Sequence, residues 1–152
     1  DTQAARMLEQ LWAGGELDAG KKLAILGAAY KPDIDDPRES PAALLAAAAR
    51  KRGLEVSVHD PLVKAGSHHG LVVSNDLPGC LRGATAAALL CEHRAYRVLS
   101  AKFFQEHLAG KLIADARNWL NHASLRRAGF NVVLLGVAKT KRHHPEAHAR
   151  CS

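Results

Sequence analysis

A polar loop over residues 27–40 holds the side chains best suited to binding a charged ligand. It joins a short apolar run, residues 23–26, to an alanine-rich helix that we expect over residues 41–52. A helix N-terminus presents unpaired backbone N–H groups and a partial positive charge, so it favours an anion. Lys31 and Arg38 add full positive charges within the loop. This combination predicts a site for a phosphate group.

The same loop carries acidic residues that outnumber its basic ones: Asp33, Asp35, Asp36 and Glu39. The loop is therefore not a simple phosphate-binding loop, and some of these carboxylates must form ion pairs within it. Pairing of Arg38 with Asp35 or Glu39 is an alternative to ligand contact. For Tyr30 and Lys31, the alternative is an aromatic ring packed on the sheet edge beside a solvated lysine.

Arg117 is a second candidate, because it follows a strand that we expect over residues 112–114. Its planar guanidinium suits a diphosphate or a base carbonyl. The structural alternative is a salt bridge to Asp115 or Asp36. Both interpretations require Arg117 to lie at the carboxyl end of a strand.

Asp60 follows the expected strand at residues 54–58, where dinucleotide-binding sheets place an acid that contacts a ribose. That role accompanies a GxGxxG fingerprint, but here Ala28 and Ala29 follow Gly27. Without the fingerprint, we favour a turn-forming role for Asp60 and the proline after it. We therefore do not expect this sheet to hold NAD by itself.

Neither the cysteines nor the histidines form a recognisable reactive set. The three cysteines share no CxxC spacing, which disfavours both a disulfide framework and a zinc site and fits a reducing cytoplasm: Cys80, Cys91 and Cys151. The paired histidines at 68–69 and 143–144 lack a cysteine or acid at ligand spacing. Ser40 has no histidine placed to activate it. We predict no catalytic and no metal-binding residue in this chain.

Short apolar runs and helical segments alternate along the sequence. We expect strands in six runs, at residues 23–26, 54–58, 71–73, 86–90, 112–114 and 132–135. We expect intervening helices at residues 41–52, 101–109 and 119–128. The alternation predicts an α/β, doubly wound fold with a mostly parallel sheet of about six strands and helices on both faces.

The helix at 41–52 has the clearest boundaries. Ser40 can accept a hydrogen bond as its N-cap, and Pro41 occupies the first position, where its missing N–H costs nothing. Gly53 supplies the left-handed stop.

Length and charge predict one domain with two appendages. The chain has 152 residues, a mass of 16.3 kDa and a net charge of +6. We expect a linker helix in residues 1–20, with an apolar face at 3–13, a domain at 21–138 and a basic, flexible tail at 139–152. With 5% aromatic residues and no basic stripe among them, the chain gives no support for nucleic-acid binding. No apolar run approaches the ~20 residues of a membrane span.

Four segments together resemble a known family. GAAYKPDIDDPRESPA, starting at Gly27, is similar to the signature that opens the C-terminal domain of UDP-glucose/GDP-mannose dehydrogenases. The later motifs of that domain resemble VSVHDP at 56–61, ALLCEH at 88–93 and KLIADARN at 111–118. The resemblance covers about residues 20–137. Glu92, His93 and Asn118 are closer to members that oxidise UDP-N-acetylhexosamines.

This resemblance implies a Rossmann-like domain that grips the nucleotide of a UDP-sugar. It implies substrate contacts from Tyr30, Lys31 and Arg117, and contact of Arg38 with NAD phosphates across a domain cleft. The family's NAD-binding domain, catalytic cysteine and dimer-forming helix all precede the matching segment. Because residue 1 is Asp rather than Met, we expect this chain to be an excised piece or a processed product.

We therefore expect the C-terminal part of an NAD-dependent UDP-sugar 6-dehydrogenase, not catalytic by itself. Its expected partners are a UDP-sugar, the N-terminal NAD-binding domain of the same enzyme and a second copy in a homodimer, with no nucleic acid and no membrane. The alternative is a stand-alone, non-catalytic nucleotide-binding or regulatory module whose basic tail recruits a partner.

Overall fold

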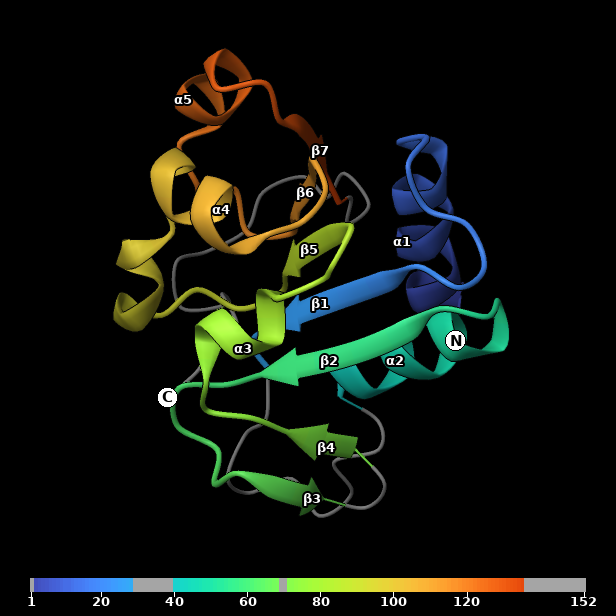
Figure 1. Ribbon diagram of the computed structural model, residues 1–152. Helices are drawn as coiled ribbons and strands as arrows, with labels where there is room; N and C mark the ends of the chain where they lie inside the picture. The colour runs from blue at the N-terminus through green and yellow to red at the C-terminus, as the bar shows by residue number, and fades with distance from the viewer. Residues whose placement is uncertain (1, 29–39, 69–70, 136–152) are drawn as a thin grey trace, which may run out of the picture.

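A parallel five-stranded sheet forms the centre of the molecule (Figure 1). The computed structural model describes residues 2–28, 40–68 and 71–135. The strands are β1 (Lys22–Leu26), β2 (Glu55–His59), β5 (Ala86–Leu89), β6 (Leu112–Asp115) and β7 (Asn131–Leu134). Their order is β2-β1-β5-β6-β7, and every neighbouring pair is parallel. The α/β, doubly wound prediction is confirmed.

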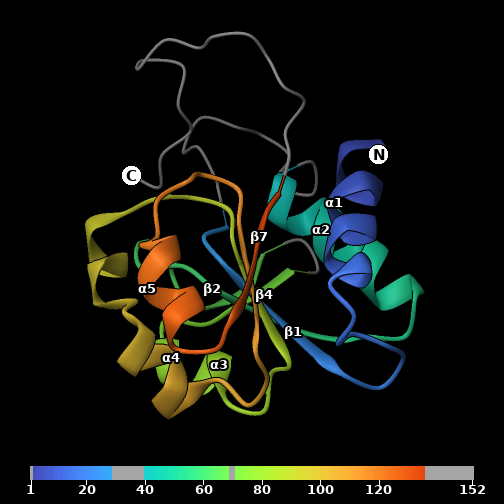
Figure 2. The same ribbon diagram turned by 90° about the horizontal axis from the view of Figure 1, so that it is seen from above.

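Helices cover both faces of this sheet, as Figure 2 shows. One face packs against α1 (Thr2–Ala13) and α2 (Pro41–Lys51). The other packs against α3 (Leu77–Leu81), the 3₁₀ helix η2 (Arg94–Val98), α4 (Ala101–His107) and α5 (His122–Arg127). Successive strand residues point to opposite faces, so Leu23 and Ile25 enter the first core, and Ala24 and Leu26 the second. Burial on both faces explains why the three inner strands, β1, β5 and β6, are almost continuously apolar.

The helix predicted at 41–52 forms as α2, which begins at the predicted residue and ends one residue earlier, at Lys51. The Ser40 hydroxyl accepts a hydrogen bond from the backbone N–H of Ala43 at 3.1 Å, and Pro41 opens the helix. Gly53 takes a φ of +89° just beyond it. The Ser40 cap and Pro41 fix the start of α2, where the loop over residues 27–40 ends.

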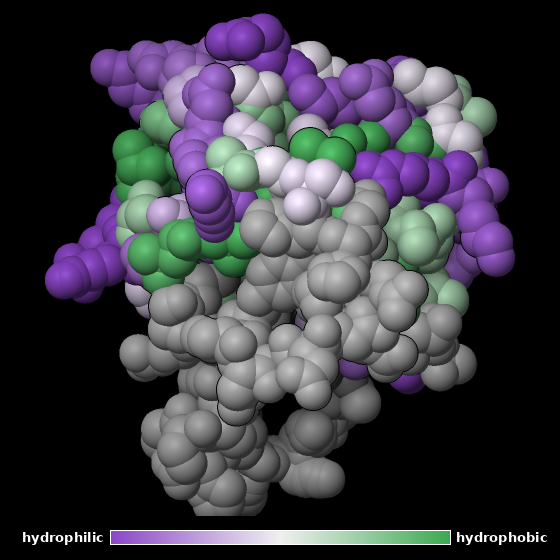
Figure 3. All heavy atoms as spheres, turned by 90° about the horizontal axis from the view of Figure 1, so that it is seen from below, coloured by the Kyte–Doolittle hydropathy of each residue, from purple (hydrophilic) through white to green (hydrophobic). Residues whose placement is uncertain are grey.

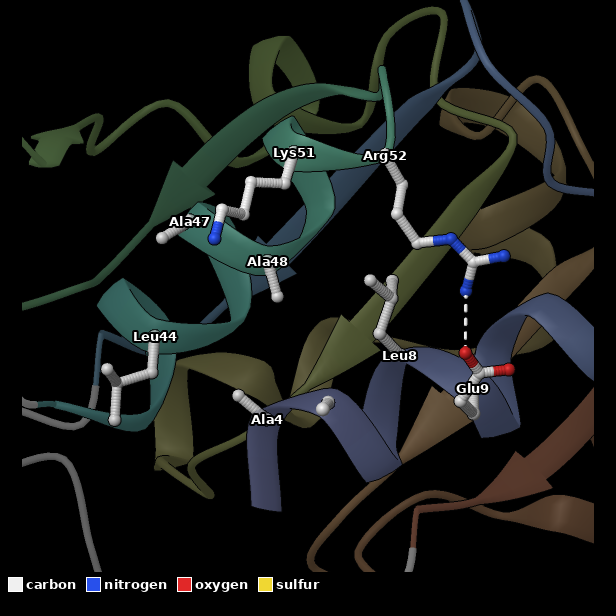
Figure 4. A pocket seen from close by; sticks show the side chains of 9 residues that line it. Ala4, Leu8, Glu9, Leu44, Ala47, Ala48, Lys51 and Arg52 are labelled. Atoms are coloured by element: carbon white, nitrogen blue, oxygen red, sulfur yellow. Dashed lines mark hydrogen bonds and ion pairs between the residues drawn. The ribbon is translucent and has the colours of Figure 1, made fainter. Parts of the chain in front are cut away.

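The predicted N-terminal helix forms as α1, and its apolar face packs into the same core as α2. Met7, Leu8 and Leu11 are buried. Arg52, just after α2, reaches Glu9 at 3.0 Å and stacks 3.8 Å from the centre of the Trp12 ring. A groove of about 450 Å³ lies between the two helices. Alanine and leucine side chains make up most of its lining (Figure 4).

The predicted third strand does not join the central sheet. β4 (Leu71–Val73) pairs in antiparallel fashion with β3 (Gly66–His68), so the central sheet has five strands rather than six. The run is short, and its middle residue, Val72, is 60% exposed, whereas every residue of β5 and β6 is buried. The helices α3 and η2 were not expected, and α4 and α5 are shorter than the predicted segments.

None of the helices in the described residues combines the length and the apolar character needed to cross a membrane. On the face viewed in Figure 3, apolar side chains form separate patches between polar ones. Leu62 and Val72 are among the large apolar residues that are exposed.

Candidate functional site

The sheet changes direction between β1 and β5, and this switch point defines the candidate site. From β1 the chain adds β2 on one side, whereas β5, β6 and β7 extend the sheet on the other. Open α/β sheets bind ligands in the crevice beyond the carboxyl ends of the strands at such a point. Here those ends lead into Gly27 after β1, Glu92 after β5 and Arg117 after β6.

Gly27 brings the end of β1 close to the end of β5. Its φ is +96°, and a Cβ placed on it would lie 2.6 Å from the Cβ of Cys91. Its backbone N–H donates to the carbonyl oxygen of His59 at 2.7 Å. Only glycine accommodates both this conformation and this close approach. The candidate loop therefore leaves the sheet from a point held by both neighbouring strands.

Asp60 organises the turn after β2 and is buried. One carboxylate oxygen accepts from the backbone N–H of Ala28 at 2.9 Å. The other accepts from the N–H groups of Leu62 at 2.8 Å and Val63 at 2.9 Å. The turn-forming interpretation is confirmed, and the bond to Ala28 also ties the start of the loop to β2. With both oxygens used by backbone groups, Asp60 is not placed as a ribose-binding acid.

A buried His–Tyr pair lies beneath this point. The hydroxyl oxygen of Tyr96, on η2, lies 2.8 Å from Nδ1 of His59 and donates to the His59 carbonyl at 3.3 Å. Burial lowers the pKa of His59 and raises the pKa of Tyr96 far above its ordinary value. Both side chains are therefore neutral near pH 7. No motif in the sequence pointed to Tyr96.

Asp115, at the end of β6, builds the turn that carries Arg117. The side chain of Asp115 is fully buried. Its Oδ1 accepts from the backbone N–H of Arg117 at 2.9 Å. Its Oδ2 accepts from the N–H groups of Trp119 and Leu120 at 2.8 and 2.9 Å and lies 2.7 Å from Nε2 of His122. One carboxylate thus fixes the path of the chain from β6 to α5.

Arg117 pairs with Glu92, an acid that the sequence had not suggested as its partner. Its Nε donates to Oε1 of Glu92 at 3.1 Å, and the two side chains are 20% and 15% exposed. Asp115 contacts Arg117 through the backbone, while Asp36 lies outside the described residues. Asn118 then takes a φ of +55°, which asparagine tolerates, so the chain turns away at once.

The other predicted site residues, Tyr30, Lys31 and Arg38, lie outside the described residues. The structure does show the two anchors of their loop, Ala28 and Ser40. Both adjoin the carboxyl edge at which Arg117 lies.

Cys91 is disulfide-bonded, although the cysteine spacing had disfavoured a disulfide framework. Cys80 is a poor candidate for nucleophilic chemistry. It is buried, burial raises the pKa of its thiol, and its Sγ contacts the Ser57 hydroxyl at 3.2 Å. A protonated, enclosed thiol is unreactive. Within the described ranges, no three histidine, cysteine or acidic side chains gather as a metal site would require.

A family model described as the UDP-glucose/GDP-mannose dehydrogenase family, UDP binding domain, matches residues 24–122. This range includes most of β1, all of β2, β5 and β6, and both members of the Arg117–Glu92 pair.

Named relatives agree with that match. The chain is 31% identical over 118 residues to a UDP-N-acetyl-D-mannosamine dehydrogenase of Methanococcus maripaludis, covering 76% of this chain and 27% of the relative. It is 29% identical over 139 residues to a UDP-glucose 6-dehydrogenase of Pseudomonas aeruginosa, covering 86% of this chain and 30% of the relative. The chain thus spans less than a third of either relative.

Among solved structures, an NDP-N-acetyl-D-galactosaminuronic acid dehydrogenase from Methanosarcina mazei superposes with a TM-score of 0.75 at 30% identity, covering 93% of this chain and 31% of that one. The match in fold therefore extends over nearly the whole chain. On these grounds the chain belongs to the UDP-glucose/GDP-mannose dehydrogenase family, as its UDP-binding domain.

Proposed function

We propose that this chain binds the nucleotide of a UDP-sugar as the C-terminal part of an NAD-dependent UDP-sugar 6-dehydrogenase. The observation that carries the proposal is the placement of Arg117. It lies at the carboxyl edge of the sheet, on a turn fixed by Asp115, with its guanidinium held by Glu92. A fixed guanidinium in that crevice suits the diphosphate of a nucleotide.

Tyr30 and Lys31 complete the proposed substrate site. Their loop starts from Ala28 and ends at Ser40, both of which adjoin the same edge of the sheet. In this proposal, the tyrosine ring packs against the nucleotide and the lysine ammonium neutralises phosphate oxygens. Arg38 contacts the phosphates of NAD held by another part of the enzyme.

The described residues do not themselves fit a complete NAD site. Ala28 follows Gly27 where a second fingerprint glycine would help the backbone approach a pyrophosphate, and the carboxylate of Asp60 is used by backbone N–H groups. We therefore assign NAD binding mainly to an N-terminal domain of the same enzyme.

The remaining parts of the proposed enzyme are assigned by family membership. An upstream cysteine would carry the oxidation of the sugar hydroxymethyl group to a carboxylate, and a homodimer would be the working form. On this proposal, the chain alone does not reduce NAD with a UDP-sugar. Relatives named for UDP-N-acetyl-D-mannosamine and for UDP-glucose both match, so we assign the substrate as a UDP-sugar.

Titration of the chain with UDP tests the nucleotide site. Charge-assisted hydrogen bonds contribute about 1.5 to 3 kcal/mol, so Arg117→Ala should weaken UDP binding by roughly 10- to 150-fold. Lys31→Ala should have a similar effect. Isothermal calorimetry, extended to millimolar UDP, measures both.

Arg127→Ala is the matched control. Arg127 is exposed in the last turn of α5, a few residues before β7 begins, so it lies toward the amino edge of the sheet. Asp60 is unsuitable as a control, because its carboxylate holds Ala28 at the start of the loop. Unchanged UDP affinity in Arg117→Ala, alongside saturable binding by the unsubstituted chain, would remove Arg117 from the site.

A further inference from the structure

The Arg117–Glu92 ion pair uses only one edge of the guanidinium. Glu92 accepts from Nε at 3.1 Å. A guanidinium has five N–H donors, four of them on the two Nη atoms. Within the residues that the structure describes, none accepts a hydrogen bond from these Nη groups. The contact therefore fixes the orientation of the group, and among the described residues it leaves the terminal fork without an acceptor.

The backbone at both ends of the pair is held independently of the pair itself. Arg117 donates its own N–H to Asp115, and Glu92 follows Cys91, which packs against Gly27. Glu92 and Arg117 also follow neighbouring parallel strands, with Leu89 of β5 in register with Asp115 of β6. Loss of the Glu92 carboxylate should therefore release the Arg117 side chain without releasing the turn that carries it.

We propose that Glu92 is a positioning residue that aims the Arg117 guanidinium at the phosphates of the bound nucleotide. The proposal rests on the proposed function, since it assigns a role within that site. An arginine side chain has many rotamers, and ordering such a side chain at an interface weakens binding measurably. The contact with Glu92 restricts the Arg117 side chain before the nucleotide binds. Less conformational entropy is then lost on binding, so the phosphate contact contributes more to the affinity.

A negative charge near phosphates also acts in the opposite sense, by repelling them. A comparison between glutamate and a neutral residue mixes this repulsion with the positioning effect. Glu92→Gln and Glu92→Met separate the two, because both remove the charge and both retain nearly the same side-chain volume. Only the glutamine offers an oxygen that can accept from Nε of Arg117.

The experiment compares the UDP affinities of the two variants by calorimetric titration. We expect Glu92→Met to bind UDP about three- to tenfold more weakly than Glu92→Gln, the range expected for ordering one long side chain. Nuclear magnetic resonance of the Arg117 Nε–Hε group provides a second readout. We expect this signal to persist in Glu92→Gln and to broaden or average with exposed arginines in Glu92→Met.

Three results would overturn the positioning role. Equal UDP affinities of the Gln and Met variants would show that the acceptor has no effect. A weaker Met variant with an unchanged Arg117 Nε–Hε signal would show that the loss arises elsewhere. Absence of saturable UDP binding by the unsubstituted chain would refute the proposed function and this role with it, whereas the first two results leave the proposed function intact.

Discussion

Replacement of Asp115 tests whether one buried carboxylate holds the turn that presents Arg117. Asp115→Ala removes the acceptor of three backbone N–H groups, at 2.8 to 2.9 Å, and of His122, at 2.7 Å. Because the Asp115 side chain is fully buried, the donors around it cannot all turn to bulk water. The substitution should therefore destabilise the fold as well as the site.

The magnitude follows from the number of donors left without an acceptor. A buried donor deprived of its partner costs about 1 to 3 kcal/mol, and four such donors set an upper limit near 12 kcal/mol. Arg117 and Trp119 are only partly buried, so the turn can relax and admit water. We expect a loss of about 3 to 5 kcal/mol, the range for breaking a buried charged network. That is a large fraction of the ~5 to 15 kcal/mol stability of a typical domain.

Urea denaturation followed by circular dichroism measures this loss. With a slope near 2 kcal/mol per molar urea, the midpoint should fall by about 2 M. Asp18→Ala, at an exposed position, should shift the free energy of unfolding by less than ~0.5 kcal/mol. A midpoint shift below about 0.5 M in Asp115→Ala would refute the reasoning, because it would mean that the turn persists without its central acceptor.

Two further predictions concern the start of the loop. Gly27→Ala should destabilise the fold by about 2 to 4 kcal/mol, because the added methyl must displace Cys91 while the backbone stays at φ +96°; a thermal midpoint unchanged from that of the unsubstituted chain would contradict this. For His59, burial lowers the folded-state pKa below the ordinary value of 6.5, so the unfolded chain binds the proton more readily. The stability contributed by neutral His59 is therefore complete above pH 6.5 and lost as the pH falls through the folded-state pKa. Urea midpoints should drop less between pH 7.5 and 5.5 in His59→Gln than in the unsubstituted chain, and equal drops would exclude His59 as the source.

The sequence predicted a helix well where the residues that set its ends lie within or next to that helix. The Ser40 cap, the proline after it and Gly53 act within a few residues of α2, and the helix has the boundaries that they indicate. The apolar run at 71–73 lacked such a signal. Whether a three-residue run pairs with the central sheet or with a neighbour depends on which of its faces is covered, and only the tertiary structure decides that.

Side-chain partners were harder to predict than strand ends. The sequence placed Arg117 after a strand, and the structure confirms this position, but Glu92 precedes Arg117 by 25 residues. Their contact requires β5 and β6 to be neighbours in the sheet, which depends on strand order. Knowledge of that order would have brought Glu92 forward as a candidate, since both residues closely follow parallel strand ends. The pairing of His59 with Tyr96 depends in the same way on where η2 crosses the sheet.

A count of acidic and basic residues overstates how strongly the candidate site would repel an anion. Asp60 and Asp115 both lie at the carboxyl edge of the sheet, and in sequence they count against an anionic ligand. In the structure, each is buried and accepts three backbone hydrogen bonds, so its negative charge is compensated locally by N–H dipoles. Glu92 is compensated by Arg117 through a single edge of the guanidinium. The acids at this edge therefore shape the turns and orient the arginine, and their presence is compatible with a phosphate-bearing ligand at the same edge.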